Sequence, residues 1–267
     1  MGVDVDGDEI RVGVDDRGVA RIEIHRPHRM NALNGAASAG IMAACNELSD
    51  RDDVRAVVID GMGGNFSTGA DVVDVFQGGQ GSGGGMDPTR ARGIISGGSE
   101  LVRAVRRVGV PVIAAVDGAA AGVGASLAFV ADLIYATERS YFLLPFVNIG
   151  LMPDGGATMS VAASIGRARA NAMALLGEKL PAAEAFDAGL VTKVVADRTA
   201  LDAVVEQVTD KLAQSSPSAL RITKAALDAH TMSDFEAALG HELDGQTELL
   251  QSAEFQAAIA AFVGAKR

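Results

Sequence analysis

Residues 110–126 read Val-Pro-Val-Ile-Ala-Ala-Val-Asp-Gly-Ala-Ala-Ala-Gly-Val-Gly-Ala-Ser. The apolar run Val110–Val116 predicts a buried strand, and the glycines that follow it predict a turn into a helix from about Gly122 to Ala131. A strand, a turn and a helix in this order form the repeating unit of an α/β fold with parallel strands. This stretch therefore places the chain in the α/β class.

The same pattern continues upstream of that stretch. Residues Ile10–Val14 and Val19–Ile24 alternate apolar and polar side chains around a turn with Gly18, which predicts a hairpin. Apolar residues recur at helical spacing over 35–48, and the run Val54–Asp60 then predicts another buried strand. The remaining predicted elements of this part are a helix over 90–108 and a strand over 133–136.

Beyond Leu151 the periodicity becomes helical, apart from a predicted strand over 190–195. We predict helices over 202–213, 218–229, 234–250 and 254–263. Short amphipathic helices need an apolar surface to cover, either their own core or another subunit. The chain is therefore divided into an α/β core, residues 1–196, and a helical C-terminal region, residues 197–267.

Composition and charge exclude several classes of partner. The chain has 267 residues, 32 of them glycine, and a formal net charge of −11, which argues against nucleic acid or an anionic membrane as the main partner. The single cysteine, Cys45, cannot form an intrachain disulfide. The acidic N-terminus has no signal-peptide pattern, and no apolar run is long enough for a membrane span. We expect a soluble cytoplasmic protein.

Two glycine-bearing turns, residues 63–71 and 117–126, each follow a predicted strand and precede a helix. The first amides of a helix have no intrahelical acceptor, so they can donate to an anion, and glycine allows close backbone approach. Two such turns that meet would form an oxyanion hole. Taken alone, each turn is also typical of a tight structural connection.

Two other interpretations of the second turn fail on sequence. Gly122-Val123-Gly124 lacks the third glycine and the later acid of a dinucleotide-binding fingerprint. The run 124–128, Gly-Ala-Ser-Leu-Ala, is not the Gly-x-Ser-x-Gly of a nucleophile elbow. We therefore expect Ser126 to be a small packed residue. The four histidines show no metal-ligand spacing, and we assign no metal.

Four motifs in one order carry a resemblance that covers essentially the whole chain. They are Arg26-Pro27 with Asn31-Ala32-Leu33-Asn34; Phe66-Ser67-Thr68-Gly69-Ala70-Asp71; Pro111–Gly118 with Gly122-Val123-Gly124; and Gly177-Glu178-Lys179-Leu180 leading to Ala188-Gly189-Leu190-Val191. With them the chain resembles the crotonase (enoyl-CoA hydratase/isomerase) superfamily.

The resemblance implies an acyl-CoA thioester substrate, a crotonase-like ββα spiral core and a helical C-terminal region that trimerises, commonly into a hexamer of two trimers. It implies no resident cofactor, since coenzyme A is part of the substrate. It also assigns the oxyanion hole to the backbone amides of Ala70 and Val123, beside Gly69 and Gly122. This assignment agrees with the two helix starts found above.

The chain departs from the family's hydratase pattern at two positions. Typical hydratases of the family use two glutamates, whereas the matching positions here are Ser126 and Phe146. Neither side chain exchanges a proton near neutral pH, which puts two-glutamate hydration in doubt. One acid remains, in Pro153-Asp154-Gly155-Gly156. This run resembles the single-acid enoyl-CoA isomerases and, most closely, the phenylacetyl-CoA epoxide isomerase type.

Asp154 is therefore the candidate acid and base, and its apolar neighbours Phe146, Val147 and Leu151 favour a raised pKa. The alternative is structural, because Pro-Asp-Gly is typical of turns and Asp154 stands where it could cap the next helix. For coenzyme A the resemblance indicates the loop 26–32, with Arg29 as a phosphate contact and the backbone of Ala32 near the adenine. Further candidates for contact with the ligand are Thr68, Gly69, Asp71, Gly122 and Lys266. The alternative for Asp71 is a helix-start cap.

Three hypotheses about function follow from these residues. The first is an enoyl-CoA isomerase that uses Asp154, Ala70 and Val123. The second is a hydratase of fatty-acid β-oxidation with an unusual arrangement for its water. The third is an acyl-CoA-binding protein without catalysis, since both standard acids are replaced.

Overall fold

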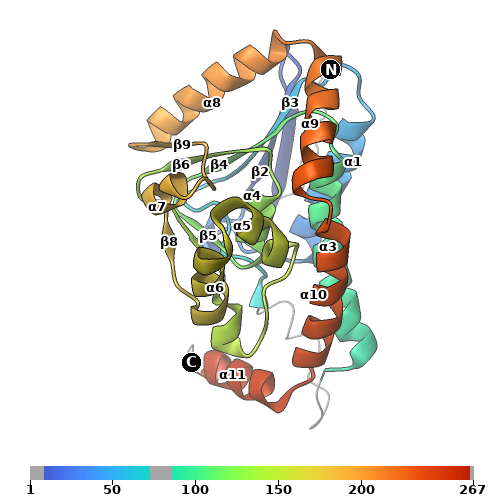
Figure 1. Ribbon diagram of the computed structural model, residues 1–267, viewed down its shortest axis with the longest axis vertical. Coiled ribbons are helices and arrows are strands. Elements are labelled where there is room, and N and C mark those ends of the chain that lie inside the picture. The colour runs from blue at the N-terminus through green and yellow to red at the C-terminus, as the bar shows by residue number, and fades with distance from the viewer. Residues whose placement is uncertain (1–8, 73–85, 265–267) are drawn as a thin grey trace.

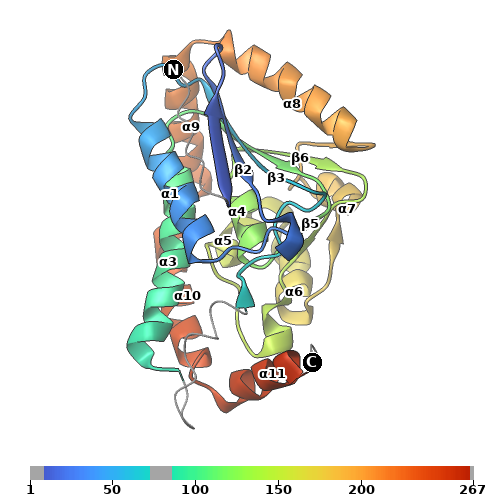
Figure 2. The same cartoon turned by 180° about the vertical axis from the view of Figure 1, so that it is seen from behind.

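The computed structural model describes residues 9–72 and 86–264. Figure 1 shows a twisted sheet with helices on both sides of it, and Figure 2 shows the same arrangement from behind. The architecture is the predicted mixed α/β fold, with a spiral core and a helical C-terminal region. Within the described ranges, no helix combines the length and the apolar character that a membrane crossing needs.

The main sheet has the strand order β1-β2-β3-β4-β6-β9. Its first two strands form the predicted antiparallel hairpin, and every later pair is parallel. Gly18 makes the hairpin turn with φ of 78°, a conformation that favours glycine. The strands are β1 (Ile10–Val14), β2 (Val19–Ile24), β3 (Ala56–Gly61), β4 (Val112–Val116), β6 (Leu133–Thr137) and β9 (Lys193–Val195).

A second, three-stranded sheet was not predicted from the sequence. It consists of β5 (Ala119–Ala121), β7 (Tyr141–Leu143) and β8 (Leu180–Pro181). Strands of two or three residues are too short for an alternation to be visible, and β5 lies inside the predicted turn 117–126. The strand predicted over 190–195 is also shorter, because Leu190 and Val191 pack into the core before β9 begins.

Helices cover the inner face of the main sheet and form the apolar core with it. Cys45 on α1 is fully buried, as predicted, and burial raises the pKa of its thiol to about 12. The helices of this part are α1 (Gly35–Ser49), α3 (Pro88–Arg107), α4 (Val123–Phe129), α5 (Ala157–Ile165), α6 (Arg167–Leu176) and α7 (Ala182–Asp187), with 3-10 turns η1 (Pro27–Arg29) and η2 (Pro145–Ile149).

The four predicted C-terminal helices are present as α8 (Arg198–Ala213), α9 (Pro217–Thr231), α10 (Phe235–Leu249) and α11 (Ala253–Gly264). The first of them, α8, covers the outer face of the sheet with Leu201, Val204 and Val205 (Figure 1). Along α3 runs α10, which places Phe235 and Leu239 in the main core. These two helices therefore complete the core of their own chain, whereas α9 has no buried residue.

Candidate active site

The two glycine-bearing turns lie against each other. Ser67 and Ala120 form a parallel bridge, in which the Ala121 N–H donates to the Ser67 carbonyl at 2.9 Å. A Cβ on Gly69 would stand 2.8 Å from the Ala121 carbonyl oxygen, so only glycine fits there. Gly69 also has φ of 93°, which L side chains rarely adopt. The structure thus brings the first turn into contact with the backbone just before Gly122.

Ala70 pairs with Leu33 in a parallel bridge on the side of the first turn opposite to Ala120. The Leu33 N–H donates to the Gly69 carbonyl at 2.7 Å, and the Asp71 N–H donates to the Leu33 carbonyl at 2.8 Å. Backbone groups of successive residues in an extended segment point to opposite sides. The Ala70 N–H therefore points away from Leu33, and Ala70 itself is exposed.

The amide of Val123 lies at the start of α4. Val123 is the first helical residue, so its N–H has no acceptor within the helix. The preceding Gly122 has φ of 54° and ψ of −135°, a combination that only glycine adopts without strain. A Cβ on Gly124 would stand 2.6 Å from the Ser67 hydroxyl oxygen, so the start of α4 packs directly on the first turn. The two candidate amides thus come from adjoining segments.

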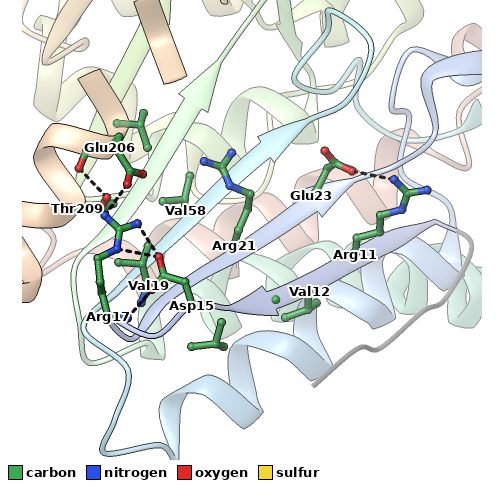
Figure 3. A pocket seen from close by; sticks show the side chains of 13 residues that line it. Arg11, Val12, Asp15, Arg17, Val19, Arg21, Glu23, Val58, Glu206 and Thr209 are labelled. Atoms are coloured by element: carbon green, nitrogen blue, oxygen red, sulfur yellow. Dashed lines mark hydrogen bonds and ion pairs between the residues drawn. The ribbon is translucent and has the colours of Figure 1, made fainter. Parts of the chain in front are cut away.

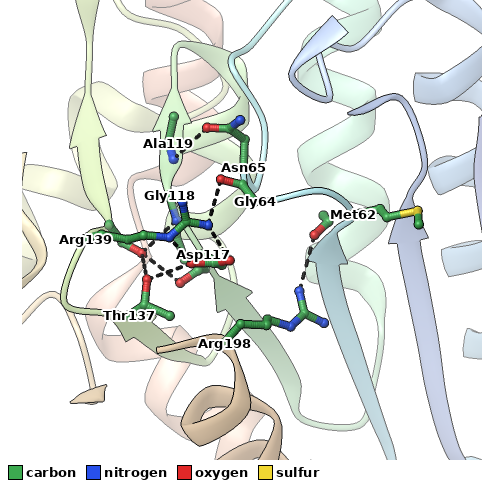
Figure 4. Close-up of polar contacts among 12 residues, drawn as sticks. Met62, Gly64, Asn65, Asp117, Gly118, Ala119, Thr137, Arg139 and Arg198 are labelled. Atoms are coloured by element: carbon green, nitrogen blue, oxygen red, sulfur yellow. Dashed lines mark hydrogen bonds and ion pairs between the residues drawn. The ribbon is translucent and has the colours of Figure 1, made fainter. Parts of the chain in front are cut away.

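A network of hydrogen bonds and ion pairs connects the two turns (Figure 4). Arg139 donates to the Asp117 carboxylate from Nε at 2.8 Å and from Nη2 at 2.6 Å, and Nη2 also donates to the Gly64 carbonyl at 3.1 Å. Asn65 Oδ1 accepts from the Ala119 N–H at 3.2 Å. Burial alone would raise the pKa of Asp117, but the hydrogen bonds from Arg139 and Thr137 outweigh it and lower that pKa.

Asp154 lies between η2 and α5, next to α4. The Ser126 hydroxyl donates to the Asp154 carbonyl at 2.7 Å, so Ser126 is the small packed residue that was predicted. The alternative prediction that Asp154 caps the following helix is wrong, because α5 starts at Ala157 and its N-cap is Gly156. Asp154 does open a turn through its carbonyl, which accepts from the Ala157 N–H at 3.3 Å. The carboxylate is left for another role.

The Asp154 carboxylate has one partnered and one unpartnered oxygen. Oδ2 accepts from the Gln246 side-chain amide at 3.2 Å. Oδ1 is shielded from solvent and has no hydrogen-bond partner among the described residues. Burial raises the pKa of Asp154 to about 7, with the Gln246 hydrogen bond lowering it and the charge of Glu242 raising it. The direction of this pKa shift agrees with the raised pKa that was expected for Asp154 from the sequence.

Sequence reasoning missed Glu242 and Gln246, both on α10. Glu242 is fully buried and caps α5 from outside, accepting from the Gly156 N–H at 2.7 Å and the Thr158 N–H at 3.0 Å. Burial raises the pKa of Glu242, although these hydrogen bonds act in the opposite direction. The available signal was positional: Glu242 and Gln246 continue the helical spacing of Phe235 and Leu239, where an apolar residue is expected.

The two positions that match the hydratase glutamates add no further acid. Ser126 is occupied with the Asp154 main chain. Phe146 is buried and its ring reaches Gly122, since a Cβ there would lie 3.9 Å from Phe146 Cζ. An apolar ring therefore stands beside the start of α4.

The predicted coenzyme A residues of the loop 26–32 are joined to the first turn by ion pairs. Arg29 donates to Asp71 from Nε at 3.0 Å and from Nη2 at 2.5 Å, and Arg26 donates to Asp71 at 3.2 Å. The Ala32 carbonyl accepts from Arg26. Burial alone would raise the pKa of Asp71, but the two arginines lower it. Asp71 therefore ties the two segments together.

Thr68 also belongs to this junction, since its N–H and its hydroxyl both donate to the Met30 carbonyl at 3.2 Å. Lys266 and the glycine-rich stretch 77–85 of the sequence lie outside the described residues. Within the described ranges, no group of three or more His, Cys, Asp or Glu residues is arranged to hold a metal ion.

A separate hollow lies on the outer face of β1 and β2, next to α8 (Figure 3). Three arginines line it and each is paired with a carboxylate: Arg11 with Glu23, Arg17 with Asp15, Glu206 and Asp210, and Arg21 with Asp60. None of the candidate catalytic or ligand residues lines this hollow. Its cations are neutralised, so it offers no evident site for a polyphosphate.

Comparison with known proteins gives one consistent family. Residues 15–267 match the family described as Enoyl-CoA hydratase/isomerase. The chain is 34% identical to the 1,2-epoxyphenylacetyl-CoA isomerase of Escherichia coli K12 over 94% of each chain. It is 36% identical to a probable enoyl-CoA hydratase of Rhodobacter capsulatus, over 92% of this chain and 91% of the other. An enoyl-CoA hydratase structure from Mycobacterium avium subsp. paratuberculosis K-10 superposes with a TM-score of 0.85, at 39% identity over 96% of each chain.

Proposed function

The chain belongs to the enoyl-CoA hydratase/isomerase family, and we propose that within it the protein is an isomerase that moves the double bond of an enoyl-CoA thioester. One observation carries this proposal. Asp154 supplies a shielded carboxylate with one unpartnered oxygen and a pKa of about 7. A base of that kind suits the removal of a proton from carbon at neutral pH.

The surroundings of Asp154 favour chemistry with a single acid. Ser126 and Phe146 stand where hydratases of the family carry glutamates, and neither exchanges protons near neutral pH. Glu242 is the other carboxylate close by, but it already accepts hydrogen bonds from Gly156 and Thr158. Isomerisation needs only one proton carrier, whereas hydration must also activate a water.

Asp154 alone can carry the proton from one carbon of the substrate to the other. Asp154 removes a proton from Cα of a 3-enoyl thioester, so a C–H bond breaks and an O–H bond forms at the carboxylate. The electron pair becomes a dienolate whose charge rests on the thioester oxygen. The protonated Asp154 then returns the proton to Cγ, which leaves the double bond between C2 and C3 and regenerates the carboxylate.

The backbone amides of Ala70 and Val123 are the proposed donors to the thioester oxygen. Preorganised N–H groups stabilise the charge that develops on an oxyanion, and loss of one such donor typically costs about 10²–10³-fold in rate. Gly69 and Gly122 allow the two backbones to come this close. Phe146 excludes water from one side, which strengthens both effects.

For coenzyme A we propose the loop 26–32, with Arg29 at a phosphate and the Ala32 backbone at the adenine. Thr68, Gly69, Asp71 and Gly122 would shape the passage to the thioester, and Lys266 would add a cation. The Arg29 side chain is half-buried beside Asp71, and a guanidinium is a strong donor to phosphate oxygens. No resident cofactor is required for this reaction.

Association into a trimer, or a hexamer of two trimers, is also part of the proposal. The described C-terminal helices include α9, which has no buried residue and exposes Ile222 and Leu227. Apolar side chains on an unburied helix are typical of a surface that meets a partner.

Incubation with 3-hexenoyl-CoA and with trans-2-hexenoyl-CoA tests the proposed reaction. An isomerase converts the first into the second, with unchanged mass and a gain of the ultraviolet absorbance of the conjugated thioester. A hydratase, the activity named for the Rhodobacter capsulatus relative, would instead add one water to trans-2-hexenoyl-CoA. Tight binding without either change would favour a non-catalytic acyl-CoA-binding protein.

Asp154→Asn and Asp244→Asn form a matched pair for this assay. Asp244 is an exposed aspartate on α10 that pairs with Arg92. We expect only Asp154→Asn to abolish isomerisation. Full activity of Asp154→Asn would overturn the proposal.

A further inference from the structure

We propose that Gln246 is a positioning residue for Asp154, and that its side-chain amide holds Oδ2 so that Oδ1 is the atom that carries the proton. This inference rests on the proposed function, because it takes Asp154 as the base. Gln246 comes from α10, 92 residues along the chain from Asp154. Its side chain forms hydrogen bonds with the Asp154 carboxylate and with the Met152 backbone.

The orientation of the Gln246 amide follows from its two contacts. The Met152 backbone N–H donates to Oε1 at 3.2 Å, and a backbone N–H can only be a donor. The oxygen of the amide must therefore face Met152, which leaves Nε2 to face Asp154. Gln246 is 1% exposed, so water does not compete for either contact. The Asp154 Oδ2 atom accordingly faces an N–H donor.

The segment 152–158 is attached to α10 at several successive points. Gly245 packs on Met152, since a Cβ there would lie 2.5 Å from the Met152 sulfur. One turn earlier on α10, Glu242 accepts from Gly156 and Thr158. Gln246 is thus held by its own helix and by the segment that it orients, which limits rotation of the Asp154 carboxylate.

This arrangement divides the two carboxylate oxygens between two tasks. Oδ2 is occupied by Gln246, and Oδ1 is shielded and has no hydrogen-bond partner among the described residues. A donor to a carboxylate favours its ionised form, whereas the nearby Glu242 charge disfavours it. Ser126 of α4 and Val102 of α3, which lie nearest to a Cβ built on Gly155 of this turn, carry no charge. Gln246 thereby keeps the base available while its free oxygen takes the proton.

Gln246→Met tests the inference with a matched control. Methionine keeps the length of the side chain and removes both hydrogen bonds. Gln251→Met makes the same change nearby, where the Gln251 amide donates only to the Thr247 carbonyl. The carboxyl titration of Asp154 is followed by NMR with ¹³C-labelled aspartate, and Asp154→Asn identifies its signal. The dependence of kcat on pH is measured for the same proteins.

In Gln246→Met we expect the Asp154 titration and the midpoint of the kcat profile to rise by about one pH unit. At pH 7 kcat falls about fivefold as a result, recovers as the pH is raised, and KM stays unchanged. Gln251→Met shifts neither midpoint. A merely structural role for Gln246 would lower activity at every pH equally and leave both midpoints in place.

Gln246→Glu extends the test if the methionine variant does not fold. Glutamate still accepts from Met152 but presents an acceptor to Asp154, so the Asp154 titration should rise further. A folded variant of either kind whose titration and kcat profile do not move overturns the inference. If the wild-type protein shows no isomerisation, the proposed function fails, and the NMR titration still decides whether Gln246 controls Asp154.

Discussion

The two parts of the candidate site are held in different ways. The amide turns around Gly69 and Gly122 are joined by bridges and hydrogen bonds between neighbouring backbone segments. Arg139 connects the two turns as well, because it donates to the Gly64 carbonyl and to the Asp117 carboxylate. The Asp154 loop is instead attached to α10, whose contacts with it span 84 to 94 residues of chain. Backbone geometry therefore positions the two amides, whereas a helix far away in the sequence positions the Asp154 carboxylate.

This difference assigns separate tasks to the two parts. Only glycine fits the backbone conformations and the close contacts of the turns, so the positions of their amides depend on backbone geometry. The pKa of Asp154 depends on the side chains of Gln246 and Glu242, so substitution of these side chains can change its protonation while the backbone stays in place. Substitutions in the two parts should consequently give different signatures, one geometric and one dependent on pH.

The largest effect is expected from Asp154→Asn. Asparagine keeps the shape and the contact with Gln246 but cannot take a proton, so kcat for isomerisation should fall by about 10³-fold or more. Binding of the acyl-CoA, measured by calorimetry, should change little, since the amide turns remain intact. Equal losses of binding and turnover would place Asp154 in the geometric part instead.

Gly122→Ala should break the other part. The Gly122 conformation costs an L residue about 1–3 kcal/mol, and rotation of the following peptide would relieve this strain and turn the Val123 N–H away. We expect a fall in kcat of about 10²-fold, equal at all pH values, because one oxyanion donor is lost. Gly97→Ala is the control, since that helical glycine has nothing within 4 Å of its added Cβ. A shift of the pH midpoint in Gly122→Ala would contradict the separation of the two parts.

Sequence alone was sufficient for the features that depend on local pattern. Buried strands such as Val112–Val116 and the glycine turns follow from spacing and from backbone rules, and the structure confirms them. The short strand Ala119–Ala121 is defined by its pairing with β7, and three residues are too few to show an alternating pattern in the sequence. The roles of Gln246 and Glu242 likewise depend on the contact between α10 and the segment 152–158, and the sequence pattern does not show this contact.

The buried acid should also cost stability in a way that depends on pH. Near pH 4 Asp154 is protonated in the folded state and about half protonated in the unfolded state, so it costs little. Between pH 4 and its folded pKa of about 7, only the unfolded state loses the proton, and stability falls. Above pH 7 the full cost, roughly 4 kcal/mol, is present. Asp154→Asn should therefore be more stable than the wild type at pH 8.

Urea unfolding at one protein concentration measures this difference. We expect the gap between Asp154→Asn and the wild type to be largest at pH 8 and to shrink toward pH 4.5. A gap of the same size at both pH values would mean that the wild-type carboxylate is not forced to ionise in a shielded place.

The smallest effect is expected from Arg139→Gln, below the amide turns. Arg139 and Arg92 have similarly exposed side chains, 58% and 57%, but their partners Asp117 and Asp244 are 4% and 75% exposed. Removing Arg139 leaves a buried carboxylate with fewer donors, and solvent at its open side replaces part of the loss, so we expect a cost of about 1–2 kcal/mol.

Arg92→Gln should cost under about 0.5 kcal/mol, because exposed ion pairs contribute little. Since Arg139 lowers the folded pKa of Asp117, its contribution is present above the ordinary aspartate pKa near 4 and is lost as the pH falls through the lower folded value. Thermal unfolding of both variants at pH 7 and at a pH well below 4 measures this. Equal costs for the two arginines at pH 7 would mean that the network under the turns is a surface feature, and that the glycines alone hold the amides in place.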